Sequence, residues 1–319
     1  MKPLSGIGIL GWAQICPQKK VTNQELAKKL SLDLKSIEAQ TGIRERYFLG
    51  PNQTAEDLVI EAARKAVAKA GIPVQEISQI ICGITSGNYR FPAAACRIQH
   101  ALKANQAFAF DIASSSTSFQ AGLDLAAAHL KTHPDARYVL VAAVAVQSPF
   151  INWKDPRLAV ILGDGAAAVV VGRVREGEGI LGSYFLTDGS LADAAFLRGK
   201  RLPLSPKDGP FIEMDGVRMG REFLKTQPAI ILKSLKQVGW TVDQLDWLIF
   251  HQANGRLIEL LMRKLKAPMT KTILTLTHRG NTAEASVPTT LCEALDQGKI
   301  LPGQRVLLSS AGAGCSLAV

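Results

Sequence analysis

The feature that most constrains the fold is a pattern that recurs in the chain at an offset of 168 residues. Residues 70–81 and 238–249 both read as the end of a helix, a short turn and a buried strand. Gly71 and Gly239 stand at the same place in the two stretches, where a helix C-cap favours glycine. The same offset relates 137–140 to 305–308, another pair of strand beginnings. We therefore expect two halves of like topology, placed at 1–172 and 173–319.

Within each half, amphipathic helical segments alternate with short, continuous apolar runs. Such runs are typical of strands that are covered on both faces. Strands are expected at 79–83, 138–146, 166–171, 247–250 and 306–308. Helices are expected at 23–30, 55–70, 91–102, 118–131, 219–237, 257–266 and 286–297. The alternation predicts an α/β fold, with helices outside central sheets.

Composition excludes several classes of protein. No apolar run in the 319 residues reaches the ~18–20 that a membrane helix needs, and the first twenty residues lack a signal-peptide pattern. The five cysteines are scattered and show no metal-ligand spacing, which argues against a disulfide framework or a zinc site and for buried thiols. We expect a cytoplasmic protein without a membrane partner.

The charge balance bears on partners. A net charge of +10 favours an acidic partner. Known nucleic-acid-binding motifs are missing and aromatic residues are scarce at 6%, so nucleic acid is not expected. An acidic protein or a phosphate-bearing cofactor fits the charge better.

Three polar segments could carry chemistry. Residues 110–119 run from a strand into a helix, and a nucleophile at such a turn would face the positive end of the helix dipole. The alternative is that the serines at 114–118 only cap the helix. His251 follows a buried strand and could act as a base or donor, or be structural. Asn281 opens a later helix and could equally be a cap.

The internal repeat links these segments. The offset of 168 places Asn281 opposite Ala113, in the turn equivalent to the serine run, and His251 ends the strand equivalent to 80–82. A pseudo-dyad would bring all three segments to one pocket. The small-residue loop 310–314 follows another strand, and its backbone N–H groups could stabilise an oxyanion. The Gly163-Asp164-Gly165-Ala166 segment lacks a phosphate-loop pattern and is read as a tight turn.

At these residues the chain resembles β-ketoacyl-ACP synthase III (ACP, acyl carrier protein), the initiating condensing enzyme of bacterial fatty acid synthesis. The similarity covers nearly the whole chain. It is carried by Val21-Thr22-Asn23-Gln24-Glu25-Leu26, Thr41-Gly42-Ile43-Arg44-Glu45-Arg46, Phe91-Pro92, Gly163-Asp164-Gly165-Ala166, His251-Gln252-Ala253-Asn254, Gly280-Asn281-Thr282 and Ala285-Ser286-Val287-Pro288. The resemblance implies a thiolase-like duplicated αβαβα five-layer fold, a homodimer, and no cofactor beyond the acyl-CoA or acyl-ACP substrate.

The resemblance also assigns roles to residues. The family's catalytic Cys-His-Asn falls on Ser116, His251 and Asn281, and its oxyanion hole falls on the backbone N–H groups of Ser116 and Ala313. Phe91 matches the residue that a partner subunit inserts into the acyl pocket. Basic positions that would dock the carrier protein are Arg256, Arg263, Lys264 and Arg221, for which a solvated helix face is the plain alternative.

Two features depart from the family. The nucleophile is serine, which is weak without a general base. Either a Cys→Ser substitution was introduced into a condensing enzyme, which the otherwise intact condensing residues favour, or Ser116 is native, which the neighbouring serines favour. Both accounts stay open. The adenine clamp for CoA is also missing, since Ser36 and Gln40 stand where Trp and Arg are frequent, with Arg157 nearby.

The resemblance leads to a condensing enzyme that joins an acyl starter to malonyl-ACP with loss of CO2, in fatty acid or polyketide synthesis. Two alternatives stay open. One is an acyltransferase that uses Ser116 as its nucleophile. The other is an inactive partner subunit, against which the retained His251 and Asn281 argue.

Overall fold

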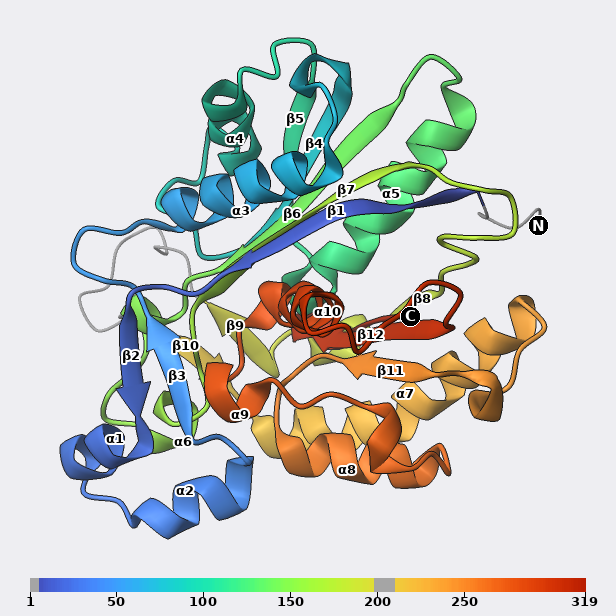
Figure 1. Cartoon of the computed structure of the whole chain (residues 1–319). Coiled ribbons are helices and arrows are strands. Elements are labelled where there is room, and N and C mark those ends of the chain that lie inside the picture. The colour runs from blue at the N-terminus through green and yellow to red at the C-terminus, as the bar shows by residue number, and fades with distance from the viewer. Residues whose placement is uncertain (1–5, 198–209) are drawn as a thin grey trace.

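The computed structural model describes residues 6–197 and 210–319, which form five layers of helix and sheet (Figure 1). The outer layer of the first half holds α3 (Ala55–Ala70) and α4 (Ala94–Leu102). Next comes a sheet in the order β1-β7-β6-β4-β5. Its strands are β1 (Ile7–Ile15), β7 (Gly165–Arg173), β6 (Tyr138–Ala145), β4 (Ile77–Ile84) and β5 (Phe108–Ile112).

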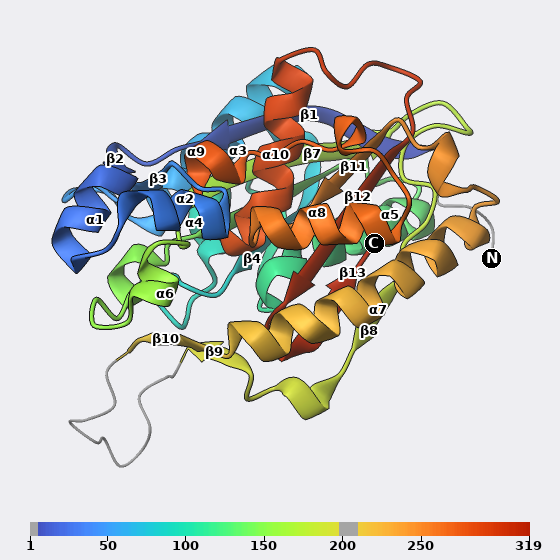
Figure 2. The ribbon, with the colours of Figure 1, turned by 90° about the horizontal axis from the view of Figure 1, so that it is seen from below.

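The middle layer consists of α5 (Ser118–Thr132) and α10 (Ser286–Asp296). Below it lies a second sheet in the order β8-β13-β12-β11, covered on its far side by α7 (Gly216–Gln237) and α8 (Gly255–Lys264), as the view from below shows (Figure 2). Its strands are β8 (Phe185–Thr187), β13 (Ser316–Ala318), β12 (Val306–Gly312) and β11 (Trp247–Phe250). The expected fold class is confirmed.

Smaller elements surround these layers. Two ribbons pair β2 (Lys19–Thr22) with β3 (Glu45–Phe48), and β9 (Ala195–Leu197) with β10 (Ile212–Met214). The short helices are α1 (Asn23–Leu30), α2 (Leu34–Thr41), α6 (Pro156–Ala159) and α9 (Leu276–Arg279). Single 3-10 turns lie at Val74–Glu76, Ser115–Thr117, Ser148–Phe150, Gly189–Leu191, Val242–Gln244, Met269–Lys271, Ala283–Ala285 and Ala313–Cys315.

The two sheets share one topology. In both, the central pair is parallel (β4 with β6, β11 with β12) and the next two pairings are antiparallel. The parallel bridge between Leu248 and Thr272 stands where β5 pairs with β4 in the first sheet. The offset of 168 relates β6 to β12, α5 to α10 and the turn Ser115–Thr117 to Ala283–Ala285. The sheets draw their strands from either side of the 173–185 segment; the boundary at 172/173 itself stays a prediction.

Three apolar clusters hold the layers together. One lies between α3, α4 and the first sheet, and includes Ala62, Leu140 and Val170. The second fills the space between the sheets around α5 and α10, and the third joins the second sheet to α7 and α8. The middle helices are covered on both sides, which explains why small residues such as Gly122 and Ala126 recur there.

Some predicted boundaries are wrong, and local contacts explain them. The helix expected from residue 91 begins at Ala94, because the Asp111 carboxylate accepts hydrogen bonds from the Ala94 and Ala95 N–H groups and caps it there. The helix expected at 257–266 occupies Gly255–Lys264, with Asn254 as its N-cap.

The cysteines depart in part from the expectation of buried thiols. Cys82, Cys292 and Cys315 are buried, but Cys96 is exposed and Cys16 is half-buried, and all five are free thiols. Among residues 6–197 and 210–319, no helix is both long and apolar enough to cross a membrane.

Candidate active site

Ser116 lies in the tight turn Ser115–Thr117, between the end of β5 and the start of α5. Its side chain is 5% exposed. Ser118 braces the turn: its Oγ accepts from the Ser114 N–H at 3.0 Å and donates to the Ser115 carbonyl at 2.8 Å. The N-cap residue of α5 is Thr117, whose side chain makes no cap hydrogen bond. The serine run therefore shapes the turn and does not cap the helix in the usual way.

The loop after β12 approaches the same turn from the second half. A Cβ on Gly312 would come within 2.9 Å of the Ser116 nitrogen, so only glycine permits this distance. The Ala313 N–H points back to the turn and donates to Ser115 Oγ at 3.3 Å. The two backbone N–H groups predicted for the oxyanion hole thus lie on adjoining segments.

His251 ends β11, and its backbone N–H donates to the Ser309 carbonyl at 2.8 Å. Its Nδ1 lies 2.7 Å from Ser286 Oγ, and that hydroxyl also accepts the Gln252 N–H at 3.0 Å. We assign the Ser286 hydroxyl as the donor and Nδ1 as the acceptor of this hydrogen bond. In a neutral ring the proton is then on the other nitrogen, Nε2. Burial lowers the pKa of His251 to about 4, so the ring is neutral at pH 7.

Asn281 is held by its backbone on three sides. Its N–H donates to the Ile161 carbonyl at 2.8 Å, and its carbonyl accepts from the Gly163 N–H at 2.9 Å and from Gln147 Nε2 at 2.7 Å. Its side-chain Oδ1 accepts the Ala283 N–H at 2.9 Å. Because Oδ1 is engaged in this way, Nδ2 is left as the group that can donate to a ligand.

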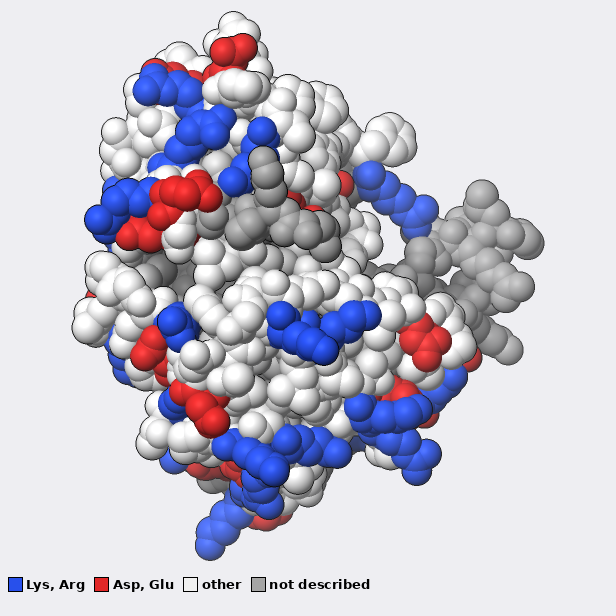
Figure 3. Space-filling view, turned by 90° about the vertical axis from the view of Figure 1, so that its right-hand side faces the viewer, with Lys and Arg blue, Asp and Glu red and all other residues white. Residues whose placement is uncertain are grey.

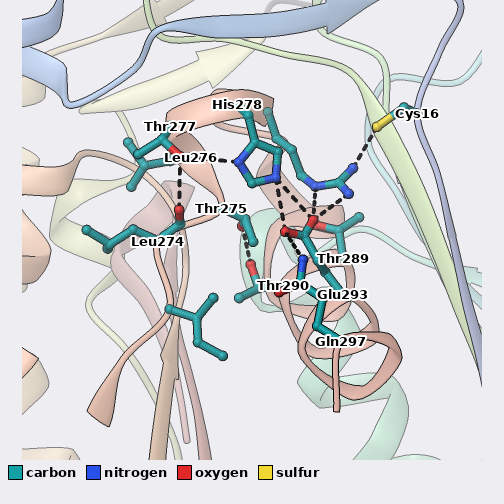
Figure 4. A network of polar contacts seen from close by, with 12 residues as sticks. Cys16, Leu274, Thr275, Leu276, Thr277, His278, Thr289, Thr290, Glu293 and Gln297 are labelled. Carbon is teal, nitrogen blue, oxygen red and sulfur yellow. Dashed lines mark hydrogen bonds and ion pairs between the residues drawn. The ribbon is translucent and has the colours of Figure 1, made fainter. Parts of the chain in front are cut away.

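The preceding residues fix the position of this loop. Gly280 has φ +67°, and a Cβ there would meet the Ile161 carbonyl at 2.9 Å. Arg279 contacts both Glu293 and Cys16: its Nε lies 2.8 Å and its Nη2 2.5 Å from Glu293 Oε2, and its Nη1 lies 2.6 Å from the sulfur. Figure 4 shows His278, Glu293 and Cys16 in this network. Burial opposes ionisation of Glu293, but hydrogen bonds from His278 and Arg279 outweigh it and lower its pKa to about 2. This ion pair anchors α9 to α10 beside Asn281.

Two of the sequence motifs, 41–46 and 163–166, supply buried polar groups that hold the segments around the site. Arg46 is fully buried and donates to Asn23 Oδ1 at 2.7 Å and to the Val160 carbonyl at 2.5 Å. Asp164 is buried too, and its carboxylate accepts from the N–H groups of Gln147, Ser148 and Leu49. The tight turn expected at 163–166 is wrong: Gly165 and Ala166 are the first residues of β7, and the buried Asp164 carboxylate holds the segment that leads into that strand.

The structure thus brings the three predicted groups to one region. The turns Ser115–Thr117 and Ala283–Ala285 pack against each other, and Ser286 links His251 to the same end of α10. Sequence reasoning missed the roles of Ser286, Ser115 and Gln147. Ser286 stood within a motif quoted above, but nothing in the sequence showed which side chain it would contact.

Outside this centre lie the residues predicted for partners. Phe91 is 84% exposed, in the loop before α4. Arg221 on α7 and Arg263 and Lys264 on α8 are exposed, whereas Arg256 is engaged with Glu259 at 2.9 Å and with the Ala39 carbonyl at 3.2 Å. Figure 3 shows that Lys and Arg outnumber Asp and Glu on one face of the molecule.

Ser36 and Gln40 both lie on α2. Ser36 is in the first turn, where its N–H donates to Asp33, and the Gln40 carbonyl accepts from Asn254 Nδ2 at 3.1 Å. A cavity of about 430 Å³ opens between α2 and α8, lined among others by Lys35, Glu38 and Arg256.

Comparisons with known proteins lead to one family. A family model described as 3-oxoacyl-ACP synthase III matches residues 110–189, and the model of its C-terminal part matches residues 235–319. Among curated proteins, the β-ketoacyl-ACP synthase III of Caldanaerobacter subterraneus is 37% identical over 317 residues, which covers 98% of this chain and 96% of that one. Synthase III 1 of Vibrio cholerae is 34% identical, with 96% of each chain covered.

Solved structures show the same likeness. The 3-oxoacyl-ACP synthase III of Aquifex aeolicus superposes with a TM-score of 0.92 at 30% identity, with 98% of each chain covered. The priming β-ketosynthase of the R1128 polyketide pathway also reaches 0.92, at 27% identity, with 100% of this chain and 96% of that one covered.

Proposed function

Since the chain belongs to the β-ketoacyl-ACP synthase III family of condensing enzymes, we propose that its own reaction is the decarboxylative condensation of an acyl starter with malonyl-ACP. The observation that supports this most is the pair of hydrogen-bond donors at the site. His251 Nε2 and Asn281 Nδ2 are both left free to donate once their other polar atoms are engaged. Two donors on one thioester carbonyl stabilise the enolate that forms as CO2 leaves.

In this mechanism Ser116 receives the acyl group. The hydroxyl oxygen attacks the carbonyl of the acyl thioester, the tetrahedral oxyanion rests on the N–H groups of Ser116 and Ala313, and the thiol leaves with the hydroxyl proton. Malonyl-ACP then loses CO2, and the enolate carbon attacks the acyl group and expels the Ser116 oxygen, which takes up a proton from water. The product is a β-ketoacyl-ACP.

The environment of His251 limits how fast the serine can be acylated. A hydroxyl needs a general base, and a ring with a pKa of about 4 is a weak one. The neutral ring is better suited to donating from Nε2 than to removing the Ser116 proton. We therefore propose that malonyl decarboxylation is intact in this chain, and that acyl loading at Ser116 is its slow step.

A second candidate function is acyl transfer through a native Ser116 to an acceptor other than a malonyl group. It is favoured by the way the flanking hydroxyls are built into the turn. Ser114 Oγ lies 2.8 Å from Thr117 Oγ1, and Ser118 Oγ bonds to the backbone at both ends of the run. These contacts need hydroxyl groups, which supports a serine-rich turn as the native arrangement.

Carrier protein, and not CoA, is the acyl donor that we propose. Among the residues the structure describes, neither Arg221, Arg263 nor Lys264 pairs with a carboxylate, so their charges are available to an acidic carrier protein. Ser36 and Gln40 offer no aromatic or cationic clamp to an adenine. We also propose a homodimer formed through β5, the edge strand of the first sheet, where Phe108 is 67% exposed.

The test is intact-protein mass spectrometry after incubation with acetyl-CoA and acetyl-ACP, combined with CO2 release from malonyl-ACP. We expect the chain to release CO2, Ser116→Cys to load acetyl and condense, and Ser116→Ala to do neither loading nor condensation. Rapid loading of the unmodified chain but not of Ser116→Ala would favour the acyltransferase. Failure of both loading and CO2 release in every variant would contradict the condensing function and favour an inactive partner subunit.

A further inference from the structure

Ser115, the residue before the proposed nucleophile, has a contact that the reaction scheme above does not use. Its Oγ accepts the hydrogen bond of the Ala313 N–H at 3.3 Å. Its backbone adopts φ +50°, a left-handed conformation that is costly for any residue but glycine. The turn therefore holds this side chain against the loop after β12.

The same loop also packs closely against the Ser115 side chain. A Cβ on Gly312 would lie 3.2 Å from the Ser115 Cβ and 3.4 Å from its Oγ. The other two serines flanking position 116 bond elsewhere: Ser114 Oγ faces Thr117 Oγ1, and Ser118 Oγ faces the backbone of the turn. Within this run, Ser115 is the side chain that reaches the Ala313 N–H.

A backbone N–H can serve one strong acceptor at a time, along one direction. The hydroxyl that accepts from Ala313 therefore stands on the line where a substrate oxyanion would have to lie to use that donor. An oxyanion hole works through donors that are already aimed at the developing charge. Here the Ala313 N–H, one of the two donors, is already bonded to Ser115 Oγ before substrate binds.

We propose that the Ser115 hydroxyl competes with the substrate for the oxyanion hole. In the resting enzyme it occupies the Ala313 N–H, and it rotates away when an acyl thioester binds. This inference rests on the proposed function. It assigns Ser115 to acyl transfer alone, because the carbonyl of malonyl-ACP is held by His251 and Asn281 instead. The residue is a positioning residue, since it acts on the Ala313 donor and forms no bond with the substrate.

The test separates the two half-reactions. In the Ser116→Cys background, Ser115→Ala is expected to accelerate single-turnover loading from acetyl-ACP about threefold to tenfold, the range of one neutral hydrogen bond. Release of CO2 from malonyl-ACP should stay unchanged. Ser115→Gly, which also suits φ +50°, should give the same acceleration. Ser190→Ala is the control and should leave loading unchanged, since this serine contacts Asp188 in an exposed turn.

A second measurement does not depend on catalysis. Hydrogen exchange of the Ala313 amide should quicken in Ser115→Ala and not in Ser190→Ala, because only the first loses the acceptor. Loading that is equal or slower in both Ser115 variants, or Ala313 exchange that does not change, would overturn this inference. If loading is missing even in Ser116→Cys, the proposed function fails, and so does the positioning role of Ser115.

Discussion

At the scale of single residues, each catalytic candidate is defined by where its second polar atom is engaged. His251 Nδ1 accepts from the Ser286 hydroxyl, and Asn281 Oδ1 accepts from the Ala283 N–H. The polar atoms that remain, Nε2 and Nδ2, are both donors. Whether a side chain donates or accepts at the site therefore depends on these supporting contacts as well as on the residue type. A freely rotating amide could present either its oxygen or its nitrogen to the substrate.

Removing either donor should stop malonyl decarboxylation. His251→Ala and Asn281→Ala are each expected to lower CO2 release from malonyl-ACP by about 10²–10³-fold, because the enolate loses half of its stabilisation. The measurement is the initial rate with saturating malonyl-ACP. His100→Ala is the matched control, since this histidine is exposed on α4 in the outer layer. A His251→Ala rate near that of the unmodified chain would refute the donor role.

Ser286 should act through His251. Without its hydroxyl, Nδ1 loses its partner and the ring can rotate or change tautomer, so Ser286→Ala is expected to lower CO2 release about tenfold. Ser286→Thr keeps the hydroxyl and should recover most of the rate. If both variants are equally impaired, the effect lies in packing at the start of α10 and not in the hydrogen bond.

At the scale of elements, the site is assembled by turns that the two sheets present to each other. The turn Ser115–Thr117 leads into α5 and the turn Ala283–Ala285 leads into α10, and the first residue of each has a positive φ, 50° and 39°. Glu284, in the second turn, is fully buried between the halves. Its Oε1 accepts both the N–H and the hydroxyl of Thr85 at 2.8 Å, while Oε2 has no partner among the described residues.

This carboxyl should make stability depend on pH. Burial raises the pKa of Glu284 to about 7 from 4.5, so the folded state binds its proton more tightly than the unfolded state. Between about pH 4.5 and 7 its contribution to stability therefore falls as pH rises, by on the order of 3 kcal/mol in total. In urea unfolding, Glu284→Gln should lack this fall.

The exposed Glu61→Gln on α3 is the control for that experiment and should follow the unmodified chain. If the free energy of unfolding of Glu284→Gln has the same pH dependence as that of the unmodified chain, the pKa of Glu284 does not differ between the folded and unfolded states.

Most of the helices and long strands could be predicted from the sequence, and each failure has a physical cause. Long helices and buried strands were found because period and apolar content agree, as in α3, whose bounds were correct. The start of α4 was missed because Asp111, fifteen or more residues away, caps it. The three-residue strands β8 and β13 carry too short a pattern to find. The residues of the site were identified through the family resemblance, but the contacts of Ser115 and Ser286 depend on chain segments brought together only by folding.

At the scale of the whole molecule, the exposed residues that we expect to contact partners lie on different elements. Exposed Arg263 and Lys264 end α8 beside the second sheet, whereas Phe91 and Phe108 are exposed at the edge of the first. One surface suits an acidic carrier protein, and the other suits a second copy of the chain.

Reversing the charge on α8 should impair use of carrier protein alone. The double change Arg263→Glu and Lys264→Glu is expected to raise KM for malonyl-ACP about tenfold or more, with a loss that shrinks at high salt. The rate with malonyl-CoA should hardly change. Lys65→Glu on α3, in the outer layer of the first half, is the control. An equal loss with both substrates would place these residues in the fold and not in docking.

The exposure of Phe91 has a genetic consequence. If its ring completes the acyl pocket of a second copy, then damage at Phe91 and damage at Asn281 fall on different sites of a dimer. Two defective alleles, Phe91→Ala and Asn281→Ala, would then complement each other: in a mixed dimer, one of the two centres receives an intact ring and an intact amide. Co-expression of the pair should restore a fraction of the activity that neither allele has alone, whereas two alleles that both carry Asn281→Ala should restore none.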